Sequence, residues 1–417
     1  MESTSVELRS RIAAAAVVIA GLLATACSTL TRLPAVPAEM TSRAEIPDIP
    51  NCRYWLDIDL EHFLQDAAEL RRREQAVLVA DGGSADPQSP VNLLAISGGG
   101  DGGAFSSGIL AGWSASGTRP KFLMVTGISA GALVAPFAFL GSEYDDVIRN
   151  VATSIGVEDV IRKRFALTGL FGDGMASSEP LARLVERYVT ADVLAEIARE
   201  YANGRLLLIG TTDLDSGRQV TWNMGAIAAS GTPGSLALFR KIMVASSSVP
   251  GVVSPVMIDV LVEGKAHQEM HVDGGVVTQV FLYPAMTLSG LQRITGRPLT
   301  HKIHGYVIRN GRIEPEWSSI ERKTLDIGMR AISSLVQFQG INDLYRLAGT
   351  ARQDKLDFNV TYIGSDFHYP HSGEFDREYM KQLFAYGYRL GETGDAWHKR
   401  LPDEPEWSPD SRAPAQR

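Results

Sequence analysis

A serine between two glycines, at the junction of a strand and a helix, is the feature that most constrains how this chain folds. Residues 122–128 are apolar or β-branched up to a glycine and predict a short buried strand, and residues 130–140 predict the helix after it. In such a G-x-S-x-G turn the serine has a strained backbone, so neighbouring chain must pass close by without side chains. We therefore expect Ser129 to be a nucleophile at the positive end of the helix, although a serine that only caps the helix is the alternative. The elbow around it comprises Gly127, Ile128, Ala130 and Gly131.

A glycine-rich junction precedes this elbow by one strand. Residues 91–96 predict a strand, and helical periodicity resumes after residues 97–105. A dinucleotide site would need an acidic residue at the end of the next strand, and a P-loop would need a closing Gly-Lys-Ser/Thr; the sequence has neither. Because loops after neighbouring parallel strands open at one edge of a sheet, we expect an oxyanion hole for Ser129 here. Its candidate residues are Gly98, Gly99, Gly100, Gly102 and Gly103.

A carboxylate far along the chain is the candidate base. A serine hydroxyl is a poor nucleophile until a group within about 3 Å takes its proton. Asp273 ends a short predicted strand, and Gly274 and Gly275 after it allow another loop to approach. Taken alone, the pattern is also typical of a turn aspartate that bonds its own backbone.

Histidine is the other residue type that activates a serine. The order Ser, Asp, His is available, and the histidines that follow Asp273 are His301, His304, His368, His371 and His398. None has a distinctive setting, so we expect these residues, together with His267 and His271, to be surface or packing residues. No pair among them has a third ligand nearby, so no metal site is expected.

The start of the chain predicts export. Arg9 and Arg11 precede an apolar run that ends at Ala26, which is short for a membrane span and typical of a signal peptide. The residues before Cys27 resemble a bacterial lipobox, which implies an acylated Cys27 and a membrane-anchored lipoprotein of the cell envelope. Cleavage near Ala26 by an ordinary signal peptidase, giving a periplasmic or secreted protein, is the alternative. With Cys27 acylated, Cys52 would have no disulfide partner.

Composition and the positions of glycine and proline suggest how the rest of the chain is organised. A net charge of −8 argues against a nucleic-acid partner. We expect a helix over residues 51–75, a hairpin turning at residues 216–217 and a loop at residues 168–174 that forms a lid or a plain connection. The expected divisions are a signal peptide (1–26), a lipidated, extended tether (27–50), a helix and loop (51–89), a catalytic domain (90–390) and a disordered tail (391–417).

Three motifs in this order resemble the patatin-like phospholipase family. They are the glycine loop at 98–103, the elbow at 127–131 and the Asp-Gly-Gly turn at 273–275, and the likeness spans residues 90–390. The resemblance implies a three-layer α/β/α fold with a central, mostly parallel sheet, and a Ser129–Asp273 dyad without histidine. Ser97 stands where many relatives have aspartate, and Gly102 where a basic residue is frequent, which bears on how a phosphate head group would be held.

The function implied is a lipid acyl hydrolase that cleaves carboxylic esters of membrane lipids through an acyl-enzyme. It needs no cofactor, metal or nucleotide, and its partner is the lipid surface itself. Two alternatives remain at this point: a catalytically silent lipoprotein that binds lipid, and an α/β-hydrolase esterase with a Ser-Asp-His triad.

Overall fold

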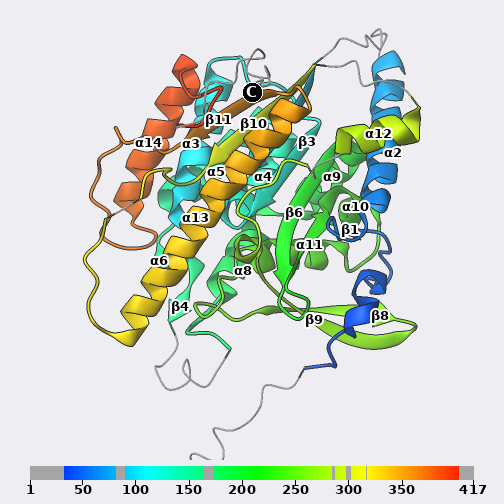
Figure 1. Cartoon of the computed structure of the whole chain (residues 1–417), viewed down its shortest axis with the longest axis horizontal. Coiled ribbons are helices and arrows are strands. Elements are labelled where there is room, and N and C mark those ends of the chain that lie inside the picture. The colour runs from blue at the N-terminus through cyan, green and yellow to red at the C-terminus, as the bar shows by residue number, and fades with distance from the viewer. Residues whose placement is uncertain are drawn as a thin grey trace, which may run out of the picture.

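The fold is built on one large sheet, seen in a computed structural model that describes residues 32–80, 90–163, 173–283, 287–296, 302–315 and 317–402. The sheet has nine strands in the order β1-β7-β6-β3-β2-β10-β11, with β9 paired to β6 and β8 paired to β9 (Figure 1). The five strands from β6 to β11 along this order are parallel, and the others are antiparallel. The strands are β1 (Arg53–Tyr54), β2 (Val91–Ile96), β3 (Met124–Ile128), β6 (Leu206–Asp213), β7 (Arg218–Asn223), β8 (Val256–Val262), β9 (Lys265–Asp273), β10 (Ile303–Arg309) and β11 (Asp357–Tyr362).

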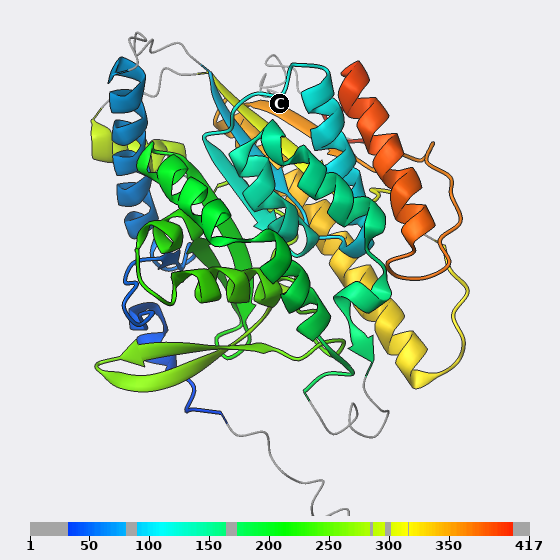
Figure 2. The same ribbon diagram turned by 180° about the vertical axis from the view of Figure 1, so that it is seen from behind.

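Helices cover both faces of this sheet. One face carries α3 (Gly103–Ala115), α4 (Ala130–Leu140), α5 (Asp145–Ser154), α8 (Glu179–Tyr188), α9 (Ala191–Ala202), α10 (Met224–Ala229), α11 (Ser235–Ser246) and α14 (Arg377–Thr393). The other carries α2 (Leu60–Ala80), α12 (Thr287–Thr295) and α13 (Thr324–Gln353) (Figures 1 and 2). The expected α/β fold class with a mostly parallel central sheet is confirmed.

Shorter elements connect these layers. They are η1 (Ala38–Arg43), η2 (Gly100–Gly102), η3 (Ser142–Tyr144), α6 (Val157–Val160), η4 (Gly274–Val276) and a two-stranded ribbon of β4 (Arg162–Lys163) and β5 (Ala176–Ser177). Among the described residues, no helix is long and apolar enough to cross a membrane.

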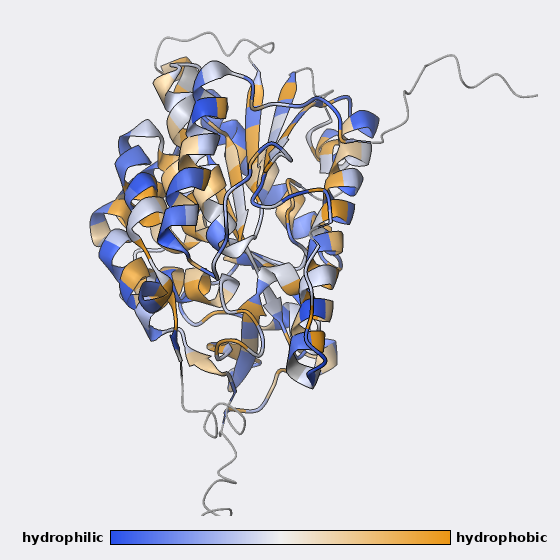
Figure 3. Ribbon diagram, turned by 90° about the vertical axis from the view of Figure 1, so that its left-hand side faces the viewer, coloured by the Kyte–Doolittle hydropathy of each residue, from blue (hydrophilic) through white to orange (hydrophobic). Residues whose placement is uncertain are grey.

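The central strands are rich in apolar residues because both of their faces are covered by helices. Every residue of β3 and β6 is buried, and β2 departs from this only at Asn92. Hydrophobic residues accordingly follow these strands between the helical layers (Figure 3). The core therefore consists of two layers of apolar side chains, one on each face of the β-sheet.

The expected helix over residues 51–75 is wrong at its start. Arg53 and Tyr54 instead form β1 and pair with Trp222 and Thr221 of β7. The helix begins at Leu60, where the Asp59 carboxylate accepts a hydrogen bond from the N–H of His62 at 3.3 Å. A two-residue strand is defined by its partner, so local periodicity could not reveal it.

The segment expected to be an extended tether is folded onto the domain from Arg32 onward. Ala44, Ile46 and Ile49 are buried in the core, and Glu45 forms a backbone bridge with Leu261 of β8. The expected disordered tail over residues 391–417 is wrong at its start, because α14 continues to Thr393 and both Ala396 and Leu401 are buried. The expected signal peptide, the acylated Cys27, most of the loop at 168–174 and the tail beyond Pro402 lie outside the described residues.

Candidate active site

Ser129 lies at the turn between β3 and α4 with φ of 54° and ψ of −123°, a backbone conformation that side-chain-bearing residues rarely adopt. The glycines on either side allow close backbone contact. A Cβ on Gly131 would lie 2.2 Å from the carbonyl oxygen of Ile96, and one on Gly127 would lie 2.5 Å from the carbonyl oxygen of Gly131. Both positions therefore exclude any larger residue, and α4 sits directly over the ends of β2 and β3.

Three consecutive serines at the end of α11, Ser246 to Ser248, hold the backbone of the elbow. The Ser246 hydroxyl accepts a hydrogen bond from the N–H of Ser129 at 3.0 Å and donates to the carbonyl of Gly210 at 2.7 Å. The Ser247 hydroxyl donates to the carbonyl of Ser129 at 3.2 Å, and the carbonyl of Ser248 accepts from the N–H of Asp273 at 2.9 Å. One short segment thus fixes the backbone of both candidate catalytic residues.

The sheet delivers Asp273 to Ser129 through a change of strand partner. Along one side of β6, the pairing with β3 ends at Gly210, which lies opposite Ile128. From the next residue of β6, Thr211, the same side pairs with β9, and Thr211 lies opposite Asp273. Asp273 therefore takes up the place that β3 leaves when the chain turns at Ser129. Gly274 fits only because it lacks a side chain: a Cβ there would lie 2.5 Å from the carbonyl oxygen of Gly210.

The two side chains make direct contact. Ser129 forms a side-chain hydrogen bond with the Asp273 carboxylate, which also accepts the N–H of Gly275 at 2.7 Å. Burial raises the pKa of Asp273 to about 6, and these two hydrogen bonds act against that rise. The geometry pairs a hydroxyl with a carboxylate that can hold a proton near neutral pH, which is what a general base requires.

The glycine loop lies against this pair. A Cβ on Gly98 would lie 3.2 Å from Cβ of Ser129, and one on Gly103 would lie 3.1 Å from Cβ of Ala130. The loop's N–H groups differ in their use. Those of Gly98, Gly102 and Gly103 donate to the carbonyls of Gln279, Gly99 and Gly100, respectively.

Two of the loop's glycine N–H groups have no acceptor in the described part of the chain. They belong to Gly99 and Gly100, which are exposed and have φ of 151° and 56°. Of the five candidate glycines, these two can therefore offer N–H groups to an oxyanion, whereas the other three have theirs engaged.

Two buried residues that the sequence analysis did not single out hold this loop in place. Asn310, directly after β10, donates from its side chain to the carbonyl of Ser97 at 2.9 Å and accepts the N–H of Ser106 at 3.1 Å. The Gln279 side chain donates to the carbonyl of Gly275 at 2.8 Å. The signal in the sequence for Asn310 is a polar residue at the carboxyl end of a parallel strand, but this signal does not identify the groups that its side chain bonds.

No described histidine hydrogen bonds to Ser129 or Asp273. The imidazole of His271, two residues from Asp273, lies between the hydroxyl of Thr211 at 2.9 Å and the carboxylate of Glu269 at 3.0 Å. The other described histidines also lie elsewhere: His62 pairs with Asp66, His267 contacts the carbonyl of Ala35, His304 pairs with Asp357, His371 pairs with Asp101 of the glycine loop, His398 bridges to Val360, and His368 is exposed. His301 falls outside the described residues.

The described ranges contain no cluster of three or more His, Cys, Asp or Glu residues that could hold a metal ion. Cys52 is buried and free.

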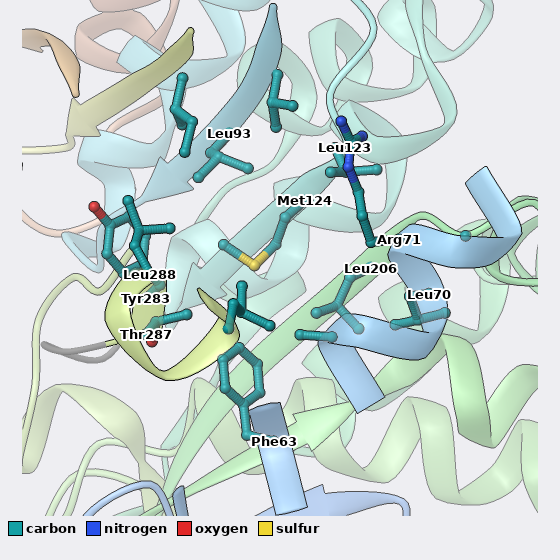
Figure 4. A pocket seen from close by; sticks show the side chains of 15 residues that line it. Phe63, Leu70, Arg71, Leu93, Leu123, Met124, Leu206, Tyr283, Thr287 and Leu288 are labelled. Atoms are coloured by element: carbon teal, nitrogen blue, oxygen red, sulfur yellow. The ribbon is translucent and has the colours of Figure 1, made fainter. Parts of the chain in front are cut away.

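A cavity of about 130 Å³ lies at the opposite edge of the sheet. Apolar side chains from α2, α12 and the amino ends of β2, β3, β6 and β10 line it, among them Phe63, Met124 and Leu206 (Figure 4). Ser129 and Asp273 are not among its lining residues, so this cavity and the candidate site are separate features.

Comparisons with known proteins agree with the motifs. Residues 94–286 match the family model of the patatin-like phospholipases, a range that contains the glycine loop, the elbow and the Asp-Gly-Gly turn. Among solved structures, the chain is similar to VipD from Legionella pneumophila, with 12% sequence identity, coverage of 75% of this chain and 68% of that chain, and a TM-score of 0.32. A search of curated proteins finds no match.

Proposed function

We propose that this chain, which carries a patatin-like phospholipase domain at residues 94–286, is a lipid acyl hydrolase in which Ser129 and Asp273 form a catalytic dyad. The observation that carries the proposal is the hydrogen bond between the Ser129 hydroxyl and a buried carboxylate whose pKa is raised to about 6. A protein that only binds lipid has no need of that pair, because an ionisable group is costly to bury.

The reaction runs in two halves. Ser129 Oγ attacks the ester carbonyl while Asp273 takes its proton, and the resulting oxyanion accepts hydrogen bonds from the N–H groups of Gly99 and Gly100. Asp273 then gives the proton to the departing alcohol, which leaves an acyl-Ser129 ester. A water molecule then attacks this ester while Asp273 takes a proton from the water. Asp273 returns that proton to Ser129 Oγ, and the carboxylic acid is released.

The substrate is an ester in a lipid aggregate, and the protein works at the membrane of the cell envelope, held there by an acylated Cys27. This part of the proposal rests on the signal-peptide and lipobox patterns of the sequence. Intact-mass measurement of the mature protein tests it, because acylation adds the mass of lipid chains to a chain that begins at Cys27.

The activity is tested by labelling the purified mature protein with a fluorophosphonate probe and mapping the labelled peptide. We expect labelling at Ser129, none in Ser129→Ala, and a sharp reduction in Asp273→Asn. Ser230→Ala, which removes a hydroxyl at the end of α10, is the matched control and should label like wild type. A folded wild-type protein that takes up no label would contradict the proposal, and full labelling of Asp273→Asn would remove Asp273 from its role.

A further inference from the structure

The long helix α13 consists of two unlike halves. Its second half packs onto the sheet through residues such as Leu344, Leu347 and Ala351, which are all buried. Its first half, residues 324–338, extends away from that packing for roughly 22 Å. We refer to this first half as the arm (Figure 1).

The arm is amphipathic, but its apolar side faces solvent. At helical spacing, Ile327, Ile332, Leu335 and Phe338 fall on one side, and they are 54%, 50%, 71% and 52% exposed. Trp317, just before the helix, is 89% exposed. A soluble domain normally turns such a stripe toward its core, so this arrangement indicates a surface that is covered by something else.

The opposite, polar side of the arm is the one that contacts the protein. The Gln337 side chain donates to the carbonyl of Glu314 at 3.0 Å. The carbonyl of Gln337 accepts a hydrogen bond from the Arg309 guanidinium at 3.5 Å. These contacts hold the apolar side outward.

The base of the arm adjoins the candidate active site. The Gln339 side chain donates to the carbonyl of Val277, four residues after Asp273. One turn further on, the Asp343 carboxylate accepts the N–H of Gln279 at 2.7 Å. The base of the arm therefore lies beside the edge of the sheet where Ser129 lies.

The start of the described chain lies at the same end of the molecule. Arg32 pairs with Asp215 in the β6–β7 turn at 2.7 Å, and this end, like the free end of α13, is at the bottom of both Figure 1 and Figure 2. Only four residues separate Arg32 from Cys27, which is the candidate acylation site. An acyl chain there would enter a bilayer at the same end of the molecule as the free end of the arm.

We propose that the arm and Trp317 form a membrane-docking surface that inserts its apolar side into the lipid surface carrying the substrate. An amphipathic helix with exposed Trp, Phe and Leu residues lies in the plane of a membrane interface in this way. Charges around the arm have both signs, with Arg322 and Lys323 beside Glu321 and Asp326, so the attraction is apolar and does not depend on anionic lipid. This inference builds on the proposed function and names the physical form of its substrate.

Trp317 provides the reporter for the test. The mature protein carrying Ser129→Ala, which hydrolyses nothing, is mixed with vesicles of brominated phosphatidylcholine and its tryptophan emission is recorded. The emission spectrum of the same protein with Trp317→Phe is subtracted, which leaves the emission of Trp317. We expect the Trp317 emission to move to shorter wavelength and to be quenched at least twofold, and to do so equally in 0.5 M salt. Leu335→Ser with Phe338→Ser should abolish the quenching. The control Ile58→Ser changes an exposed apolar residue outside the arm, with 48% exposure against 52% for Phe338, and should leave the quenching unchanged.

A second measurement separates this inference from the proposed function. With Ser129 intact, Leu335→Ser with Phe338→Ser should reduce hydrolysis of vesicle lipid at least tenfold and leave hydrolysis of a soluble short-chain ester within twofold of wild type. Unaltered Trp317 emission in vesicles overturns the docking surface, as does a shift that occurs without lipid and grows with protein concentration, because a second copy is then the occupant. Loss of all ester hydrolysis by wild type, with Trp317 still quenched, overturns the proposed function alone.

Discussion

The two edges of the parallel sheet are packed in opposite ways. At the carboxyl edge, glycines bring backbone against backbone, so that Gly99, Gly131 and Gly274 each leave no room for a Cβ. At the amino edge, bulky apolar side chains such as Phe63 and Met124 meet and leave a cavity of about 130 Å³. The difference teaches that a site requiring fixed distances is built from backbone contacts, whereas apolar packing at the other edge tolerates unfilled space.

The strongest way to break this contrast is to add a side chain at the carboxyl edge. A Cβ on Gly99 would lie 2.0 Å from the carbonyl oxygen of Asn310, and φ there is 151°. We expect Gly99→Val to lower kcat by about 10²–10³, the loss typical of one oxyanion donor. Steady-state hydrolysis of a soluble ester measures it. Gly117→Val is the control, because Gly117 also has positive φ but no atom lies within 4 Å of its Cβ position; equal losses in both variants would contradict the argument.

The pH dependence tests the buried acid at this edge that contacts Ser129. Asp273 acts as a base only when deprotonated, so with a pKa of about 6 we expect kcat/KM to fall about tenfold per pH unit below pH 6, or roughly a hundredfold at pH 4. The rate should level off above pH 7. A profile that continues to rise from pH 7 to pH 9 would assign the limiting proton to another group.

The same shift predicts an effect on stability. Because the folded-state pKa lies above the value of 3.8 for a free aspartate, Asp273 favours the folded state least when the pH exceeds about 6. Asp273→Asn should therefore stabilise the protein relative to wild type by on the order of 2–3 kcal/mol at pH 8, and this gain should vanish as the pH falls toward 4. Urea unfolding at the two pH values measures the difference.

A smaller effect is expected from the residue that clamps the glycine loop. Asn310→Ala removes the hydrogen bonds of that side chain to Ser97 and Ser106, so the unfolding free energy should fall by about 2 kcal/mol and kcat by about tenfold. Asn359→Ala is the matched control, since this buried asparagine on β11 bonds only to backbone carbonyls of the sheet and to Lys399. We expect it to lose similar stability with kcat retained.

The smallest effect on catalysis is expected at the amino edge. Ala67 lines the cavity from α2, and Ala67→Leu adds apolar volume there at little cost in helix propensity. The variant should gain about 1 kcal/mol of stability and change kcat less than twofold. A marked change of kcat would mean that the two edges are coupled and that the contrast is incomplete.

Features set by adjacent residues could be predicted from the sequence. The strand at 91–96 and the helix at 130–140 have the predicted bounds, and the hairpin at residues 216–217 joins β6 to β7 as expected. Hydrophobic periodicity and glycine spacing are local signals, so they locate elements whose partners are unknown.

Features set by distant partners could not be predicted. The clamp by Asn310 and the strand change that brings Asp273 to Ser129 depend on pairings between segments far apart in the chain. The outward-facing arm of α13 escaped notice for the same reason: its apolar residues have helical spacing, and the sequence does not say which side of a helix meets the core.

The folded start of the chain also covers the open strand edges of the β8–β9 hairpin. Glu45 bridges to Leu261 on the outer edge of β8, and on β9 the N–H of Gln268 donates to the carbonyl of Pro34 at 3.0 Å. A chain shortened to begin at residue 51 would leave both edges open, and open strand edges recruit other chains. Residues 32–50 thus prevent edge-to-edge aggregation through β8 and β9, the strand pair that carries Asp273.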